Sequence, residues 1–252
     1  MTTTSTDQPA VAVEQVRKRY RSTQAVDGIS LTVARGETVG ILGANGAGKT
    51  TLVEMIAGLR TPDTGSVQVL GLHPARDRAR LRQVLGVQLQ DAYLHHALTA
   101  RELVELYRSF YPHPRGTEET LDLVELGGHR DTQFEKLSGG QKQRLSVALA
   151  LVGRPRMVIL DELTTGMDPR ARRRMWRAIE ALKADGVTIL IVSHAMDEVE
   201  RLCDRLLLLQ DGQVLAEGTP AEVTAQAQAA NLEDAFVALT GTTIDDLELE
   251  EL

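Results

Sequence analysis

The chain has 252 residues, of which 42% are hydrophobic, and a formal net charge of −7. This length suffices for one large domain or two small ones. The negative charge argues against non-specific binding to nucleic acid, and no apolar stretch approaches the ~18 residues of a membrane span. The single cysteine, Cys203, excludes an internal disulfide and fits a reducing compartment. We therefore expect a cytoplasmic globular protein without a nucleic-acid partner, which reaches a membrane only through another protein.

Hydrophobic periodicity divides the chain into short strands and helices. Residues 1–10 are polar and rich in threonine, so we expect them to be disordered. Strands are predicted over residues 11–16, 29–33, 38–42, 66–70, 84–89, 157–160, 187–192, 206–209 and 213–216. Helices are predicted over residues 51–57, 99–110, 117–126, 141–152, 170–183 and 195–202. Thr117 and Asp168 are the expected N-caps of two of these helices.

The order of these elements predicts an α/β domain with an insertion. Three of the predicted helices follow one another between about residues 91 and 153, with no strand among them. This segment is the expected helical subdomain of a larger domain that covers residues 11–225. Residues 226–252 form a tail with helical character and an acidic end. The pattern therefore favours one α/β domain that carries a helical insertion and a tail.

Residues 43–50, Gly-Ala-Asn-Gly-Ala-Gly-Lys-Thr, fit the spacing G-x-x-x-x-G-K-[ST] between an apolar strand and a helix. Glycines let the backbone approach a phosphate closely, and the amides of a helix N-terminus point at its oxygens. Lys49 is placed for the β- and γ-phosphates, the Thr50 hydroxyl for Mg²⁺ and Thr51 for the α-phosphate. The predicted nucleotide ligands are Gly43, Asn45, Gly46, Ala47, Gly48, Lys49, Thr50 and Thr51.

Two adjacent carboxylates, Asp161 and Glu162, end the apolar strand at residues 157–160. Ligands of α/β sheets bind at the carboxyl ends of the strands. Asp161 is the expected partner of Mg²⁺, and Glu162 is placed to orient or deprotonate an attacking water. A solvated strand end is the alternative interpretation of this pair on its own. The glycine-rich loop favours the catalytic interpretation.

A second glycine-rich stretch, Leu-Ser-Gly-Gly-Gln at residues 137–141, precedes a helix. Ser138 is the expected cap of that helix, and the glycines leave backbone amides open to an anion. An ordinary capped helix start is the alternative. The stretch lies between the phosphate loop and the Asp-Glu pair, and in this order it resembles the signature of the ATPase subunits of ABC transporters. The resemblance implies that Ser138, Gly140 and Gln141 contact ATP bound to a second copy of the chain.

Four further positions match this family. The resemblance implies that Tyr20 stacks on adenine, that Gln90 senses Mg²⁺ and the attacking water, and that His194 contacts the γ-phosphate. It also implies that Asp168 acts in the loop that joins the two subunits. The alternatives are a half-buried tyrosine at a strand end, a structural histidine and a plain helix N-cap. Gln88 competes with Gln90 for the glutamine role.

The resemblance covers about residues 11–225 and implies a P-loop NTPase core of the RecA type, an N-terminal antiparallel β portion and a helical subdomain. It implies hydrolysis of ATP with Mg²⁺, a head-to-tail dimer with a second copy of the chain or a homologous ATPase, and a separate permease that holds the protein at the inner face of the cell membrane. The chain departs from the family at Leu163, where proline is usual. The tail at residues 231–241 resembles those of ABC-2-type drug or antibiotic exporters. An importer subunit, or a non-transport ATPase acting on ribosomes or DNA, is the alternative.

Overall fold

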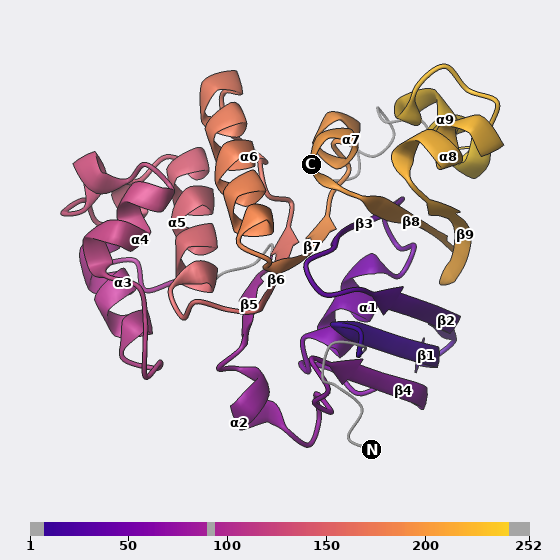
Figure 1. Cartoon of the computed structure of the whole chain (residues 1–252), viewed down its shortest axis with the longest axis horizontal. Coiled ribbons are helices and arrows are strands. Elements are labelled where there is room, and N and C mark those ends of the chain that lie inside the picture. Colours follow the sequence, from indigo (N-terminus) through magenta and orange to yellow (C-terminus); the bar gives the residue numbers. More distant parts are fainter. Residues whose placement is uncertain (1–7, 90–93, 242–252) are drawn as a thin grey trace. The chain divides into compact units, whose positions relative to one another are not determined.

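The computed structural model describes residues 8–89 and 94–241, which fold as two compact units. Of the described residues, the first unit joins 8–81 to 190–241, and the second comprises 82–89 and 94–189. Figure 1 labels the elements of both units. No helix in the described ranges is long and apolar enough to cross a bilayer. Each unit is described separately below.

The first unit contains an antiparallel sheet of three strands in the order β2-β1-β4. The central strand pairs with both neighbours, Val11 with Val33 on one side and with Val69 on the other. Apolar side chains alternate along it, and Val11, Val13 and Val16 are buried. The three strands are β1 (Val11–Tyr20), β2 (Thr23–Val33) and β4 (Thr64–Val69).

The same unit carries a fully buried strand, β3 (Thr38–Gly43), which lies parallel to β8 (Arg205–Gln210). A parallel strand covered on both faces is expected to be continuously apolar, as these two are. β8 continues into the antiparallel β9 (Gln213–Gly218). Helix α1 (Lys49–Ile56) contacts β3 and all three strands of the antiparallel sheet. The remaining helices of the unit are α2 (Arg78–Leu81), α7 (Met196–Leu202), α8 (Pro220–Gln226) and α9 (Leu232–Thr240).

The second unit pairs β5 (Leu85–Gln88) with β6 (Met157–Asp161) in parallel. Three of its helices, α3 (Ala100–Arg108), α4 (Thr117–Leu123) and α5 (Gly139–Leu151), contact one another, and α5 also contacts both strands. The unit ends with the long helix α6 (Pro169–Ala184). Two single 3-10 turns complete it, η1 (Gly127–His129) and η2 (Phe134–Lys136). β7 (Thr188–Val192) spans the boundary between the units.

The predicted elements are found, with shifted ends. β1 and β2 extend to a two-residue turn at Arg21 and Ser22, because polar side chains on the exposed face weakened the apolar signal there. The prediction of Thr117 as an N-cap is wrong: Gly116 is the cap, and Glu119 bonds back to its amide. Ala10 is buried and its amide donates to Val33, so the ordered chain includes this residue. Residues 1–7 and the acidic end lie outside the described ranges.

Candidate functional site

The phosphate loop follows β3 and depends on its glycines. Gly43, Gly46 and Gly48 have φ of 150°, 78° and 99°, a region that residues with a Cβ rarely adopt. A Cβ on Gly43 would lie 2.5 Å from the Leu209 carbonyl oxygen, and one on Gly48 2.3 Å from that of Ala25. Two of these glycines therefore serve close backbone approach as well as backbone conformation.

Helix α1 begins at Lys49 without a side-chain cap, since its N-cap residue is Gly48. The Lys49 ammonium donates to the carbonyl oxygens of Gly43 at 2.8 Å and Ala44 at 3.0 Å, so it bends back over the loop. Thr50 is exposed and Thr51 half-buried on the first turn of the helix. Amides at an uncapped helix start attract an anion. Neighbouring residues thus supply a lysine, two hydroxyls and a helix N-terminus without a side-chain cap.

Among the other loop residues, Asn45 is exposed and Ala47 is buried at 4% exposure. The Ala47 amide donates to Ala44, and its carbonyl accepts from Gly212 in the β8–β9 turn. The side chain of Ala47 therefore fills the base of the loop, and any contact with a nucleotide is left to the backbone.

In the second unit, Asp161 ends the buried strand β6 and is itself buried at 6% exposure. The Gln88 side-chain oxygen accepts the Asp161 amide at 3.1 Å, and its side-chain nitrogen donates to the Leu89 carbonyl. Gln88 is 2% exposed and extends the β5–β6 ladder by one bond. Both polar atoms of the Gln88 side chain are thus hydrogen-bonded to backbone groups. Gln90, its competitor, lies outside the described residues.

Glu162 adopts a left-handed backbone with φ of 52°, unusual for a residue with a side chain. Such a conformation costs on the order of 1–3 kcal/mol and needs support from its surroundings. The Gln143 side chain on α5 supplies it by donating to the Glu162 carbonyl at 2.6 Å. Leu163, at the position where proline is usual in the family that the sequence resembles, is fully buried. Gln143 was missed by sequence analysis because nothing local marks this contact.

The signature stretch begins α5 with a complete capping box. The Ser138 hydroxyl accepts the Gln141 amide at 3.3 Å, and the Gln141 side chain accepts the Ser138 amide at 2.8 Å. The same Gln141 side chain lies 3.0 Å from the Nε2 atom of His129. The prediction of Ser138 as a cap is therefore confirmed. A Cβ on Gly140 would lie 2.9 Å from the Gly166 carbonyl oxygen, so the helix start is pressed against that loop.

Asp168 is the N-cap of α6, followed by Pro169 as predicted. Its Oδ1 atom accepts the amides of Ala171 at 3.0 Å and Arg170 at 2.9 Å. These two hydrogen bonds to the charged form lower the pKa of the Asp168 carboxyl. The helix-cap role is therefore established, and the loop that contains Asp168 lies beside the signature through Gly166.

Two predicted residues remain, both in the first unit. Tyr20 is the last residue of β1 and is half-buried. His194 follows β7 and is half-buried, next to the buried Ser193, whose hydroxyl accepts the Ala195 amide at 3.0 Å. The first unit thus holds the phosphate loop, Tyr20 and His194. The second holds Asp161, Glu162, Asp168 and the signature.

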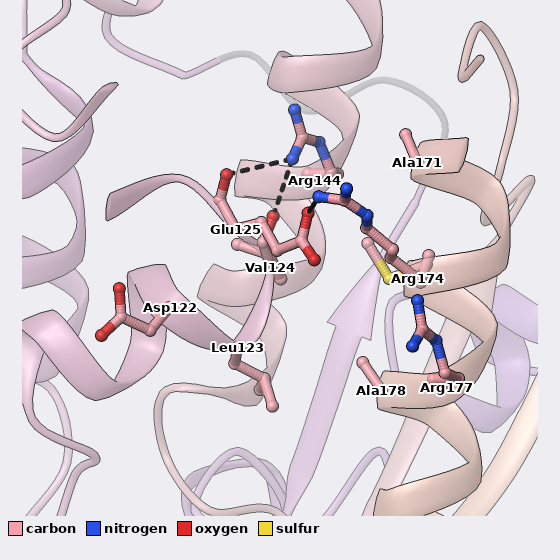
Figure 2. A pocket seen from close by; sticks show the side chains of 10 residues that line it. Asp122, Leu123, Val124, Glu125, Arg144, Ala171, Arg174, Arg177 and Ala178 are labelled. Carbon is pink, nitrogen blue, oxygen red and sulfur yellow. Dashed lines mark hydrogen bonds and ion pairs between the residues drawn. The ribbon is translucent and has the colours of Figure 1, made fainter. Parts of the chain in front are cut away.

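A pocket of about 280 Å³ opens in the second unit between α4, α5 and α6 (Figure 2). Arg144 donates there to the carbonyl oxygens of Val124 and Glu125, and Arg174 pairs with the Glu125 carboxylate. Figure 2 shows the Arg144 guanidinium turned toward these carbonyls and the Arg174 guanidinium toward the Glu125 carboxylate. None of the predicted site residues lines the pocket. We attribute its charges to the packing of α4 against its neighbours.

Comparisons with known proteins agree with this geometry. The sequence model of the family described as ABC transporter matches residues 26–165. The Nod factor export ATP-binding protein I of Rhizobium meliloti is 46% identical over 220 residues, which are 84% of this chain and 65% of that protein. The protein of the same name from Neorhizobium galegae is 43% identical over 217 residues, 84% of this chain and 62% of that protein. The match thus spans less than two thirds of these relatives' length.

Two solved structures resemble the whole fold. A dimeric ATP-binding cassette in a post-hydrolysis state, bound to ADP and Pi, superposes with a TM-score of 0.77 at 27% identity. That likeness covers 83% of this chain and 98% of the other. An ATP-binding subunit of an ABC transporter superposes with a TM-score of 0.79 at 27% identity, covering 96% of this chain and 98% of that one. The expected P-loop NTPase fold is confirmed.

Proposed function

Since this chain belongs to the ABC transporter family, we propose that it binds ATP and hydrolyses it to ADP and phosphate to drive a membrane transporter. The phosphate loop carries this proposal. It combines glycines at positive φ, an uncapped helix start and a lysine that bends over the loop. Together these features suit the triphosphate of a nucleotide.

The loop acts mainly through charge and position. Lys49 gives up its two backbone partners and neutralises the β- and γ-phosphates, while the amides of α1 surround the remaining oxygens. Tyr20 offers its ring to the adenine. The glycines allow the loop backbone to come close to the phosphates.

Mg²⁺ fits the oxygen donors that the chain offers. Magnesium prefers hard oxygen ligands and keeps several waters. The Thr50 hydroxyl and the Asp161 carboxylate are such donors, and Gln90 is a third candidate. When bound, the metal neutralises charge on the phosphates.

Glu162 is the residue we assign to the attacking water. Its backbone is left-handed directly after β6, and the Gln143 side chain donates to its carbonyl. The carboxylate orients the water and accepts its proton, while His194 and Gln90 contact the γ-phosphate and the water. Catalysis is then positioning and charge stabilisation around a reaction that needs little covalent help.

We assign the signature to a second copy of the chain. Ser138, Gly140 and Gln141 would face the ATP held by the phosphate loop of the partner, and Asp168 would join the two subunits. The solved relative that is a dimer with ADP and Pi supports this assembly. ATP closes the pair, and hydrolysis reopens it.

Export is the direction we favour, because the relatives named above are export ATP-binding proteins. The tail that resembles exporter tails forms α9, capped by Asn231 and ended by Gly241 at φ of 70°. A separate permease would hold the protein at the inner face of the membrane and supply the substrate specificity.

The ATPase proposal is tested with Glu162→Gln, which keeps the size of the side chain and removes its basicity. We expect ATP binding to be retained, turnover to fall at least about a hundredfold, as for loss of a general base, and dimers to accumulate with Mg-ATP on a sizing column. Glu105→Gln, at an exposed acid on α3, is the matched control. Wild-type turnover in Glu162→Gln would refute the assignment of the base.

The partner is tested by capture of tagged Glu162→Gln from detergent-solubilised native membranes with Mg-ATP, read by mass spectrometry. A polytopic membrane protein in equal amount supports transport and identifies the permease. Ribosomal proteins or nucleic-acid enzymes without a membrane protein would overturn transport and leave the ATPase assignment standing.

A further inference from the structure

The hydroxyl of Tyr20 does not hold its ring in place. It is buried, and it has no hydrogen-bond partner within residues 8–89 and 94–241. A buried hydroxyl without a partner costs free energy and fixes no orientation. The ring is therefore placed by what lies against its faces.

Two cations lie over the Tyr20 ring. The Arg60 guanidinium carbon is 5.1 Å from the ring centroid, and the Lys18 ammonium is 6.0 Å away. Each cation has its own carboxylate: Arg60 Nε donates to Glu54 Oε2 at 2.5 Å, and Lys18 Nζ to Asp63 Oδ1 at 2.6 Å. The shorter distance makes Arg60 the principal cation–π partner of the ring.

Arg60 is fixed at both its ends. Its backbone amide and that of Leu59 donate to the Glu54 carbonyl at 3.1 Å and 2.9 Å, which closes the turn after α1. The Glu54 carboxylate holds the guanidinium and raises the pKa of Arg60, so the charge persists at any working pH. Glu54 belongs to α1, the helix that starts at Lys49. One helix thus carries the phosphate lysine and the anchor of the tyrosine ring.

We propose that Arg60, held by Glu54, is a positioning residue that orients the Tyr20 ring for the base of the nucleotide. This proposal rests on the proposed binding of ATP at the phosphate loop. Arg60 acts through Tyr20 and contacts no phosphate. Without it the ring gains freedom that base stacking must remove, so affinity for the base falls while affinity for the triphosphate stays.

The test compares a ligand that has a base with one that lacks it. ATP and inorganic tripolyphosphate each displace a fluorescent ATP analogue from the purified full-length chain. We expect Arg60→Met to weaken ATP about fivefold, the size of one cation–π contact, and to leave tripolyphosphate unchanged. Arg17→Met is the matched control. Arg17 forms an ion pair with Asp27 as short as that of Arg60 with Glu54, and both Arg17 and Asp27 lie in the sheet that carries Tyr20. This control should change the affinity for neither ligand.

Two further variants separate positioning from general stability. Tyr20→Phe removes only the unpartnered hydroxyl, so ATP affinity should stay at the wild-type value. In a Tyr20→Ala background, Arg60→Met should weaken ATP no further. Glu54→Gln keeps an acceptor for Arg60 but no charge, and should give a smaller loss than Arg60→Met, with tripolyphosphate again unchanged.

Each outcome decides one of the two proposals. Equal losses for ATP and tripolyphosphate, or an undiminished effect of Arg60→Met without Tyr20, would overturn the positioning role and leave ATP binding intact. A wild-type chain that binds neither ligand would overturn the proposed function itself. A fall in the melting midpoint alone, with an unchanged ATP-to-tripolyphosphate ratio, would make Arg60 a structural residue.

Discussion

The two glycine-rich helix starts of this chain look alike in sequence and differ in structure. At α1 the N-cap is Gly48, which has no side chain that could accept a hydrogen bond from the first amides. At α5 the Ser138 hydroxyl and the Gln141 side chain satisfy the amides of the helix start reciprocally. An open helix start binds an anion by itself, whereas a closed one presents only what its own cap leaves free.

The glycines differ in the same way. Gly48 is left-handed and lies where a Cβ would meet a carbonyl oxygen, whereas a Cβ on Gly139 would have nothing within 4 Å. The first glycine is required by the fold of the loop. The second lies in open space at the start of α5.

The largest effect is expected at the loop. Gly48→Ala puts a Cβ 2.3 Å from the Ala25 carbonyl oxygen and forces a left-handed alanine, which alone costs about 1–2 kcal/mol. We expect ATP binding to be lost and the melting midpoint to fall. Titration with a fluorescent ATP analogue and a thermal melt measure the two effects.

Gly139→Ala is the paired variant for that prediction. Since its site is open and its backbone is not left-handed, the single chain should keep its melting midpoint and its ATP affinity. Equal damage from the two alanines would show that the helix starts do not differ as described.

The next-largest effect is expected at Gln143 on α5, the helix that begins with the capping box. Gln143→Ala removes the 2.6 Å hydrogen bond to the Glu162 carbonyl, so the left-handed backbone of Glu162 loses this support. We expect kcat to fall about tenfold, as for one lost charge-positioning contact, with KM for ATP unchanged. Gln143→Glu, which places an acceptor against a carbonyl, should behave like the alanine. Steady-state kinetics decide this, and a raised KM with normal kcat would contradict it.

A smaller effect is expected at Ser138, the N-cap of α5. Ser138→Ala should destabilise the chain by about 1 kcal/mol, the usual cost of a lost N-cap, without changing ATP affinity of the single chain. Ser138→Asn restores a good cap with a different side chain. Stability should therefore return in a denaturant titration while turnover stays low, because the hydroxyl is lost to the partner's ATP. Full recovery of turnover in Ser138→Asn would show that Ser138 serves only as a helix cap.

The sequence predicted those parts of the site whose chemistry is local. The loop from Gly43 to Thr50, the cap at Ser138 and the strand that ends at Asp161 each follow from neighbouring residues. The Glu162 turn did not, since it depends on a side chain of α5 that meets it only in the folded chain. The hold of Arg60 on Tyr20 was missed for the same reason.

Some misses came from competing local signals. Gly116 and Thr117 are both acceptable helix starts, and the chain uses the glycine because Glu119 reaches back to its amide. The choice of Gln90 over Gln88 is not such a miss: Gln88 is buried against the Asp161 backbone, and the role of Gln90, outside the described residues, stays a prediction. Leu163 departs from the family pattern, and its side chain is fully buried.

The smallest effect concerns a third helix start, α6, which is closed by a charge. Because Asp168 accepts the amides of Ala171 and Arg170, its pKa is lowered in the folded chain. The carboxylate therefore stabilises the fold above the ordinary pKa of aspartate, and this contribution is lost as pH falls through the lowered value. Asn caps a helix without titrating. The difference in melting midpoint between wild type and Asp168→Asn should accordingly shrink from neutral to acidic pH, and a constant difference would mean that the charge contributes nothing to this cap.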